Sequence, residues 1–151
     1  MNWSLEQLQE RLKSNPALKC KGLNDFTEVS KMAGTILKPS VKGGWRDDLQ
    51  RYFRSSWEAN YARYLNFIGE PWEYEAKEWE FPVKRGNRYY KCDFYLPRLH
   101  EYHEVKGWMD KGSQTKLKRM AKYYPEVKIK VICKEEYQAI SKSKALIPYW
   151  E

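Results

Sequence analysis

The stretch from residue 88 to residue 107, RYYKCDFYLPRLHEYHEVKG, constrains the fold of this chain more than any other. Its residues alternate in polarity on both sides of Leu96–Arg98, and this pattern predicts two strands joined by a turn that contains proline. Because successive side chains of a strand point to opposite faces, an antiparallel pairing would bring Asp93 and Glu104 together, with Lys106 one pleat beyond. Two carboxylates beside an ammonium group suit a hard divalent cation and a phosphate.

A further carboxylate precedes this hairpin, on a predicted helix. Ser55 is suited to cap the helix, and a stripe of apolar residues, ended by Gly69, follows at helical spacing: Trp57, Tyr61, Tyr64, Leu65 and Ile68. Glu58 comes three residues after Ser55, which is the spacing of a capping box. It also lies at the edge of the apolar stripe, where its carboxylate could point toward a sheet. The sequence leaves both interpretations of Glu58 open.

The remaining periodic segments predict an alternation of strands and helices. Strands are expected at 72–75, 79–84 and 127–133, helices at 113–124 and 135–141, and a short helix at 45–53. The connection from the strand of Glu104 through helix 113–124 to strand 127–133 is long enough for a parallel, right-handed pairing. A chain of 151 residues with these elements is the size of one α/β domain.

The first part of the chain differs in composition from the rest. Capping and apolar signals predict a helix at 4–14, which Asn15-Pro16 would end. Between residues 17 and 44, five lysines are mixed with glycines and a proline, which fits either a basic arm that contacts nucleic acid or a solvated connector. We therefore divide the chain into an N-terminal helix and basic arm or linker (1–44) and a main domain (45–151).

The positive charge of the chain is concentrated in one region. Lys and Arg number 28 against 20 Asp and Glu, a net charge of +8, and such a surplus suggests a polyanion as partner. Residues 105–134 hold nine of these cations and two acids, a net of +7, whereas residues 70–80 hold five Glu and one Lys. Five cations in and beside the predicted helix 113–124 are either contacts to phosphate or an ordinary solvated helix face: Lys111, Lys116, Lys118, Arg119 and Lys122.

Other kinds of site receive less support from the sequence. Cys20, Cys92 and Cys133 lack the paired spacing of a disulfide framework or a structural zinc site, and the last two fit small core positions. His100 and His103 lie three residues apart, so in a strand they would face opposite sides and would not bind one metal ion together. No apolar run is long enough to cross a membrane and no signal peptide is recognisable, so we expect a soluble protein of the cytoplasm.

Four residues, taken in chain order, carry a resemblance to a known family. They are Glu58 in RSSWEANYARYL, Asp93 in YYKCDFYLP, and Glu104 with Lys106 in YHEVKGW. On these motifs the chain resembles the PD-(D/E)XK nuclease superfamily, in particular small endonucleases borne by phages and prophages, over residues 54–133. The family has proline before the aspartate where this chain has Cys92; that proline shapes the strand and binds no metal, so the departure weakens the pattern more than the chemistry.

The resemblance implies a restriction-endonuclease-like α/β core, a mixed β-sheet flanked by helices, with the N-terminal helical and basic extension outside it. It implies hydrolysis of DNA phosphodiester bonds with Mg2+, for which Mn2+ can substitute. Asp93 and Glu104 would bind the ion, and the family adds the carbonyl oxygen of Val105 as a third ligand. Glu58 would bind the ion through water or recruit a second ion, while Lys106 would orient or help to deprotonate the attacking water.

The resemblance also suggests a class of DNA substrate and leaves one alternative function open. Branched or junction DNA, formed during phage replication, recombination or packaging in a bacterial host, is one expected substrate class. A homodimer would make paired cuts natural. The alternative function is a DNA-binding module that retains the fold and charge without catalysis. The complete set of Asp93, Glu104 and Lys106 favours the enzyme, because a binding module has no need of it.

Overall fold

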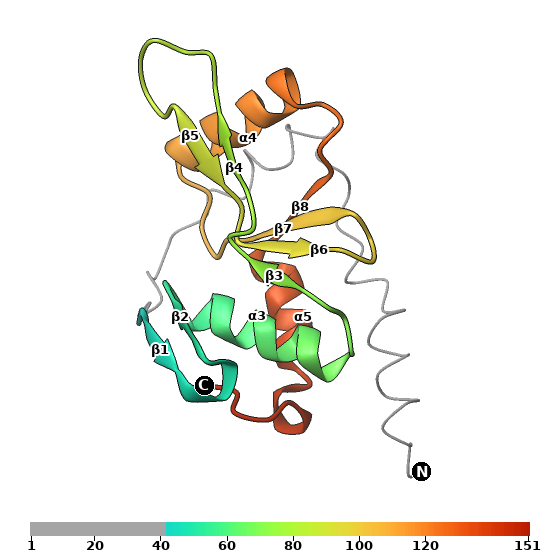
Figure 1. Cartoon of the computed structure of the whole chain (residues 1–151). Coiled ribbons are helices and arrows are strands. Elements are labelled where there is room, and N and C mark those ends of the chain that lie inside the picture. The colour runs from blue at the N-terminus through green and yellow to red at the C-terminus, as the bar shows by residue number, and fades with distance from the viewer. Residues whose placement is uncertain (1–41) are drawn as a thin grey trace.

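The computed structural model describes residues 42–151, so the predicted helix at 4–14 and nearly all of the predicted basic arm lie outside the described residues. The elements follow in this order (Figure 1): β1 (Gly44–Arg46), the 3-10 helix η3 (Asp47–Leu49), β2 (Arg51–Phe53), α3 (Ser56–Phe67), β3 (Glu73–Tyr74), β4 (Glu78–Glu80), β5 (Tyr89–Lys91), β6 (Phe94–Leu96), β7 (Glu101–Val105), α4 (Lys111–Tyr123), β8 (Ile129–Ile132), α5 (Lys134–Ser141) and the 3-10 helix η4 (Lys144–Leu146). This part of the chain is therefore of mixed α/β class, as predicted.

The largest sheet of the described residues has four strands in the order β3-β6-β7-β8. Strand β6 pairs antiparallel with both β3 and β7, whereas β7 and β8 run parallel, so the predicted parallel pairing across helix α4 is confirmed. Two antiparallel pairs, β1 with β2 and β4 with β5, complete the strands. The β6–β7 register pairs Phe94 with His103, and continued by one residue it sets Asp93 opposite Glu104.

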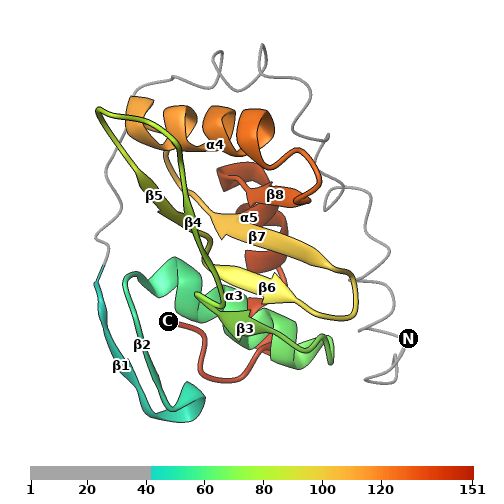
Figure 2. The same cartoon turned by 45° about the horizontal axis from the view of Figure 1, so that its top comes forward.

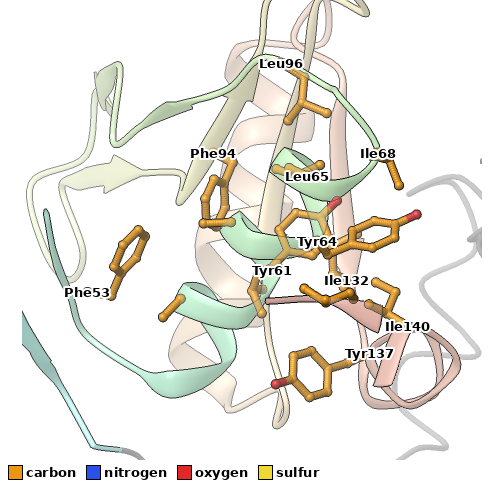
Figure 3. Close-up of a cluster of buried hydrophobic side chains, with 14 residues drawn as sticks. Phe53, Tyr61, Tyr64, Leu65, Ile68, Phe94, Leu96, Ile132, Tyr137 and Ile140 are labelled. Atoms are coloured by element: carbon orange, nitrogen blue, oxygen red, sulfur yellow. The ribbon is translucent and has the colours of Figure 1, made fainter. Parts of the chain in front are cut away.

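Helices cover both faces of the four-stranded sheet. Figure 2 shows α4 on one side of the sheet and α3 on the other. The larger core cluster lies on the α3 side and also includes residues of α5; ten of its members are labelled in Figure 3. Phe94 and Leu96 of β6 are completely enclosed there, and burial of each such side chain contributes roughly 1.5–3 kcal/mol to folding.

A second core cluster forms on the α4 side. It joins α4 to the β4–β5 pair through Trp79, Phe81, Tyr90, Cys92, Leu117 and Met120. Cys92 is therefore a small core residue, as predicted. Because β7 alternates between the two clusters, Val105 packs in the larger cluster while Tyr102 packs against the second. The α4 side is also the side on which Glu104 meets Tyr90.

The segment 45–53 was expected to form a short helix, and this expectation is wrong. It forms the β1–β2 hairpin, in which Trp45 pairs with Tyr52, and η3 turns the chain between the strands. The apolar spacing of the segment fits a helix as well as a strand, but aromatic residues favour the pleated surface, where Trp45 and Tyr52 are cross-strand neighbours. The hairpin also buries Phe53 completely in the larger core.

The first strand of the 88–107 stretch was expected to be continuous, but the structure divides it. Residues Tyr89–Lys91 pair with β4, whereas Phe94–Leu96 pair with β3 and β7. The packing side changes at the break: Tyr90 and Cys92 lie in the cluster on the α4 side, whereas Phe94 and Leu96 lie in the larger cluster on the α3 side. Asp93 thus lies at the point where the chain leaves one sheet and enters another.

The predicted helix starts agree with the capping interactions. The hydroxyl oxygen of Ser55 accepts a hydrogen bond from the Glu58 amide, 3.1 Å away, at the start of α3. Asp110 caps α4 in the same way through the Ser113 amide, so this helix begins two residues before its predicted start. Among the described residues, no helix is long and apolar enough to cross a membrane.

Candidate functional site

Asp93 is the most deeply buried carboxylate of the site, with a relative exposure of 1%. Its Oδ2 accepts a hydrogen bond of 2.8 Å from the Val105 amide, and its Oδ1 accepts one of 2.6 Å from Nη2 of Arg54. Burial raises the pKa of Asp93 well above its usual range, and the charges of Glu104 and Glu58 raise it further. A carboxylate in this position needs nearby positive charge to remain ionised.

Glu104 and Lys106 follow on the next strand and its extension. Glu104 is 5% exposed; one oxygen accepts a hydrogen bond of 3.0 Å from the Tyr90 hydroxyl, and the other lies 3.1 Å from the ammonium of Lys106. Burial works against the charge of Lys106, but Glu104 and Asp93 outweigh it and raise the pKa of the lysine. Lys106 is therefore a stable cation beside both carboxylates.

Glu58 makes hydrogen bonds at the start of α3 and also lies close enough to Asp93 to act on its charge. Its Oε1 accepts a hydrogen bond of 3.0 Å from the Ser55 hydroxyl, and its Oε2 accepts one of 3.2 Å from the Arg54 amide. The hydroxyl of Tyr74 donates a further hydrogen bond to Oε2. The charge of Glu58 is also one of the causes that raise the pKa of Asp93. The backbone bond that Glu58 accepts thus comes from Arg54, one residue before the amide that a capping box uses, and this contact at the helix start does not exclude a place beside Asp93.

Arg54 was not identified from the sequence, yet it lies among three carboxylates. Its guanidinium is 2.6 Å from Asp93 and 3.2 Å from Glu75, and its Nε is 3.9 Å from Glu58. Burial disfavours its charge, but Asp93 and its other partners raise the pKa of Arg54 above its ordinary value. Glu75 was missed as well; its amide donates to the Asp93 carbonyl oxygen at 2.8 Å, which holds β3 beside the site. The cluster of acids at 70–80 and the position of Arg54 beside the helix cap were the available signals.

A pocket of about 50 Å³ opens beside Glu104 and Lys106. Of the residues that the structure describes, four cations, one carboxylate and two hydroxyl groups border it: Arg54, Lys91, Lys106, Lys116, Glu104, Tyr90 and Ser113. Burial raises the pKa of Tyr90, so its hydroxyl keeps the proton that it donates to Glu104. The lining is therefore strongly positive, which suits an anion.

The five basic residues predicted to contact DNA do not act as one group in the structure. Lys116 borders the pocket, and within residues 42–151 no carboxylate forms an ion pair with it. At about 100° per residue, Lys111, Lys118 and Lys122 form a separate stripe of α4, and all three are exposed. Arg119 donates hydrogen bonds to the carbonyl oxygens of Asn87 and Arg85, and it thereby fastens the β4–β5 loop to α4.

The two histidines lie apart from Asp93 and Glu104, one as a turn residue and the other as a packed residue. His100 lies on the exposed turn between β6 and β7 with a φ of 53°. His103 points into the α3 side of the sheet, where its Nδ1 is 2.6 Å from the hydroxyl of Tyr61. Burial, with the charge of Lys130, lowers the pKa of His103 from 6.5 to about 3. His103 is thus a neutral core residue at ordinary pH.

The donor set fits a divalent cation even though residues 42–151 contain no group of three His, Cys, Asp or Glu side chains placed to hold one. Mg2+ typically takes one or two carboxylates together with waters and substrate phosphate. Asp93 and Glu104 supply two carboxylates. The Val105 amide donates to Oδ2 of Asp93, so Oδ1 is the oxygen of Asp93 without this backbone hydrogen bond. The backbone of Val105 therefore lies beside this carboxylate. The repulsion that Glu104 and Glu58 exert on Asp93 is the kind of charge imbalance that a cation offsets.

The chemistry available here follows from these groups together. Converging carboxylates with a lysine can hold a hard cation, and the adjacent positive pocket can hold an anion such as a phosphodiester. Comparison with known proteins assigns no family: no family model matches this chain, and neither curated proteins nor solved structures give a match.

Proposed function

We propose that this protein is a metal-dependent DNA endonuclease with a restriction-endonuclease-like core of the PD-(D/E)XK superfamily. The observation that carries the proposal is the convergence of Asp93 and Glu104, both buried, with the ammonium of Lys106 at 3.1 Å from Glu104. Burial and the charge of Glu104 raise the pKa of Asp93, and such a perturbed carboxyl group is typical of a functional site. The mixed sheet with helices on both faces supports the same proposal.

The residues of the site divide the work of phosphodiester hydrolysis. Asp93 and Glu104 would hold Mg2+ or Mn2+, which supplies charge stabilisation at the phosphate and makes water more acidic. The hydrogen bonds from Val105 to Asp93 and from Tyr90 to Glu104 fix the two carboxylates before the ion arrives. Lys106 orients the attacking water and offsets negative charge as it develops on the phosphate.

Glu58 and the basic residues have supporting roles in this proposal. Glu58 adds negative charge behind Asp93, and it holds Arg54 through the hydrogen bond to the Arg54 amide. Lys116 offers the phosphate a cation from α4 at the border of the pocket. The exposed stripe formed by Lys111, Lys118 and Lys122 is suited to more distant phosphates of the same DNA.

One observation favours the alternative, a DNA-binding module without catalysis. Arg54 and Lys106 already neutralise Asp93 and Glu104 by ion pairs of 2.6 and 3.1 Å. Such a network is able to maintain the fold and a basic surface with no metal ion. This alternative requires salt-sensitive DNA binding that persists in EDTA and no cleavage with any metal.

A cleavage assay separates the two functions. Plasmid, linear duplex, single strand, flap and four-way junction DNA are incubated with the protein in Mg2+, Mn2+ or EDTA; the branched DNAs are included because we propose them as preferred substrates. We expect cleavage with either metal and at least about a hundredfold loss of rate for Asp93→Asn and Lys106→Met. Glu126→Gln and Lys142→Met, two exposed positions, are the matched controls and should cleave like wild type. Inactivity on every DNA with both metals refutes the enzyme.

A further inference from the structure

Arg54 occupies the oxygen of Asp93 that a metal ion needs. Oδ2 of Asp93 is engaged by the Val105 amide at 2.8 Å, and Oδ1 receives Nη2 of Arg54 at 2.6 Å. A divalent cation and a guanidinium on the same oxygen repel each other, because both are positively charged and the site is buried. Metal binding at Asp93 therefore requires Arg54 to withdraw from Oδ1.

Arg54 is exposed enough to change rotamer, and it borders a pocket into which its guanidinium can move. Its side chain is 54% exposed, unlike the carboxylate that it binds, so a change of rotamer meets little packing resistance. It borders the pocket of about 50 Å³ together with Lys91, Lys106 and Lys116. Glu75 binds Arg54 at 3.2 Å and Lys91 at 3.7 Å, so the two cations already share a partner at the rim of this pocket.

The pocket is suited to a phosphodiester group. Cations from four separate segments of the chain line it, and the hydroxyls of Tyr90 and Ser113 supply hydrogen-bonding groups. Among residues 42–151, Glu104 is the one carboxylate of this lining. Arginine binds phosphate through two parallel N–H donors, which gives it an advantage over lysine for this anion. Once it leaves Asp93, the Arg54 guanidinium can therefore reach the pocket by a change of rotamer and bind a phosphate there.

We infer that Arg54 is an exchangeable cation: it neutralises Asp93 in the free protein and contacts a phosphodiester of DNA once a divalent cation binds Asp93. This inference rests on the proposed function, since it takes its metal ion and its DNA from there. Arg54 is a binding residue in this scheme. A metal ion at Asp93 releases Arg54 for the DNA phosphate, and a DNA phosphate holds Arg54 away from Asp93. Metal binding and DNA binding therefore each raise the affinity for the other.

The test measures Mn2+ binding, followed by the electron paramagnetic resonance signal of free Mn2+, and needs no turnover. In the absence of DNA, Arg54→Gln should bind Mn2+ at least about fivefold more tightly than wild type, because the competing cation is gone. A short duplex with phosphorothioate linkages should raise the Mn2+ affinity of wild type. It should raise that of Arg54→Gln much less. Arg88→Gln, an exposed arginine paired with Glu80 on the β4–β5 hairpin, is the control and should behave like wild type in both titrations.

The outcomes separate this inference from the proposed function. Mn2+ binding by Arg54→Gln that is equal to or weaker than that of wild type overturns the exchange, and so does an unchanged effect of the duplex. If wild type itself binds no Mn2+, with or without the duplex, the metal-dependent function falls and the exchange falls with it. Arg54→Lys keeps the positive charge and replaces Arg54→Gln in the Mn2+ titration if the glutamine variant does not fold. Its Mn2+ affinity without DNA should exceed that of wild type, because lysine lacks the fork that holds Asp93, and a lower affinity overturns the inference.

Discussion

His103 makes the stability of this protein depend on pH in a way that can be worked out from its surroundings. The residue is buried on β7, receives a hydrogen bond from Tyr61 of α3, and faces the charge of Lys130 on β8. Burial and the charge of Lys130 lower the pKa of His103, so the imidazole is neutral in the folded protein. Oε2 of Glu101, 3.5 Å from Nε2, can only accept, which places the ring proton on Nε2 and makes Nδ1 the acceptor of the Tyr61 hydroxyl.

The sign and the size of the effect follow from the two pKa values of His103. The unfolded chain takes up a proton near pH 6.5, whereas the folded protein takes it up only near pH 3. A group whose folded pKa is lowered contributes stability that is complete above the unfolded value and is lost as the pH falls toward the folded value. From pH 7 to pH 5 this loss amounts to about 2 kcal/mol of unfolding free energy. The whole window lies above the folded pKa, so the size hardly depends on its exact value.

Urea unfolding followed by tryptophan fluorescence at pH 7, 6 and 5 measures this effect. Wild type should lose about 2 kcal/mol more than His103→Gln over this range. Asp93, whose raised pKa acts in the opposite direction, is present in both proteins and cancels in the difference. His100→Gln, at the exposed turn, is the matched control and should follow wild type. Equal losses for wild type and His103→Gln would show that His103 is not held neutral, which contradicts the packing described above.

Two further predictions concern stability. Asn60 is completely buried and makes hydrogen bonds of 3.0 Å to Tyr137 and 2.7 Å to the Glu151 carbonyl oxygen, while its own oxygen accepts bonds from Arg63 and the Glu151 amide. Asn60→Ala should therefore lower the unfolding free energy in urea by about 3–4 kcal/mol, and a loss below about 1 kcal/mol would disprove the network. A Cβ on Gly107 would lie 3.0 Å from two ring atoms of Trp57, so Gly107→Ala should cost about 1–3 kcal/mol and alter the near-ultraviolet circular dichroism of that ring. An alanine variant with the thermal midpoint of wild type would contradict this close approach.

Local patterns in the sequence were sufficient for a large part of the fold. The α3 cap at Ser55 and the β6–β7 hairpin were predicted because the residues that form them are neighbours in the chain. The parallel pairing of β7 and β8 was predictable from the length of the connection between them. Asp93, Glu104 and Lys106 come together as expected, because the hairpin register alone aligns the first two.

The features that were missed depend on partners distant in the chain. Arg54 is 39 residues from Asp93, and no periodicity relates the two. The β1–β2 hairpin has an apolar spacing that also fits a helix, and the burial of Phe53 against β6 decides between the two. Alternation likewise could not reveal the division of the strand at Asp93. The apolar spacing continues in the sequence, while the pairing partner and the cluster that receives the apolar side chains both change.

The division at Asp93 determines where this chain can tolerate a change of length. One residue added just before Asp93 would move β5 by one position against β4, and would send its buried Tyr90 to the solvent side. One residue added just after Asp93 would leave β5 in place but would remove Asp93 from its position opposite Glu104. The exposed part of the loop between β4 and β5, residues 84–88, bears neither constraint. Insertions and deletions are therefore compatible with the site in that loop, and incompatible with it at residues 92–94.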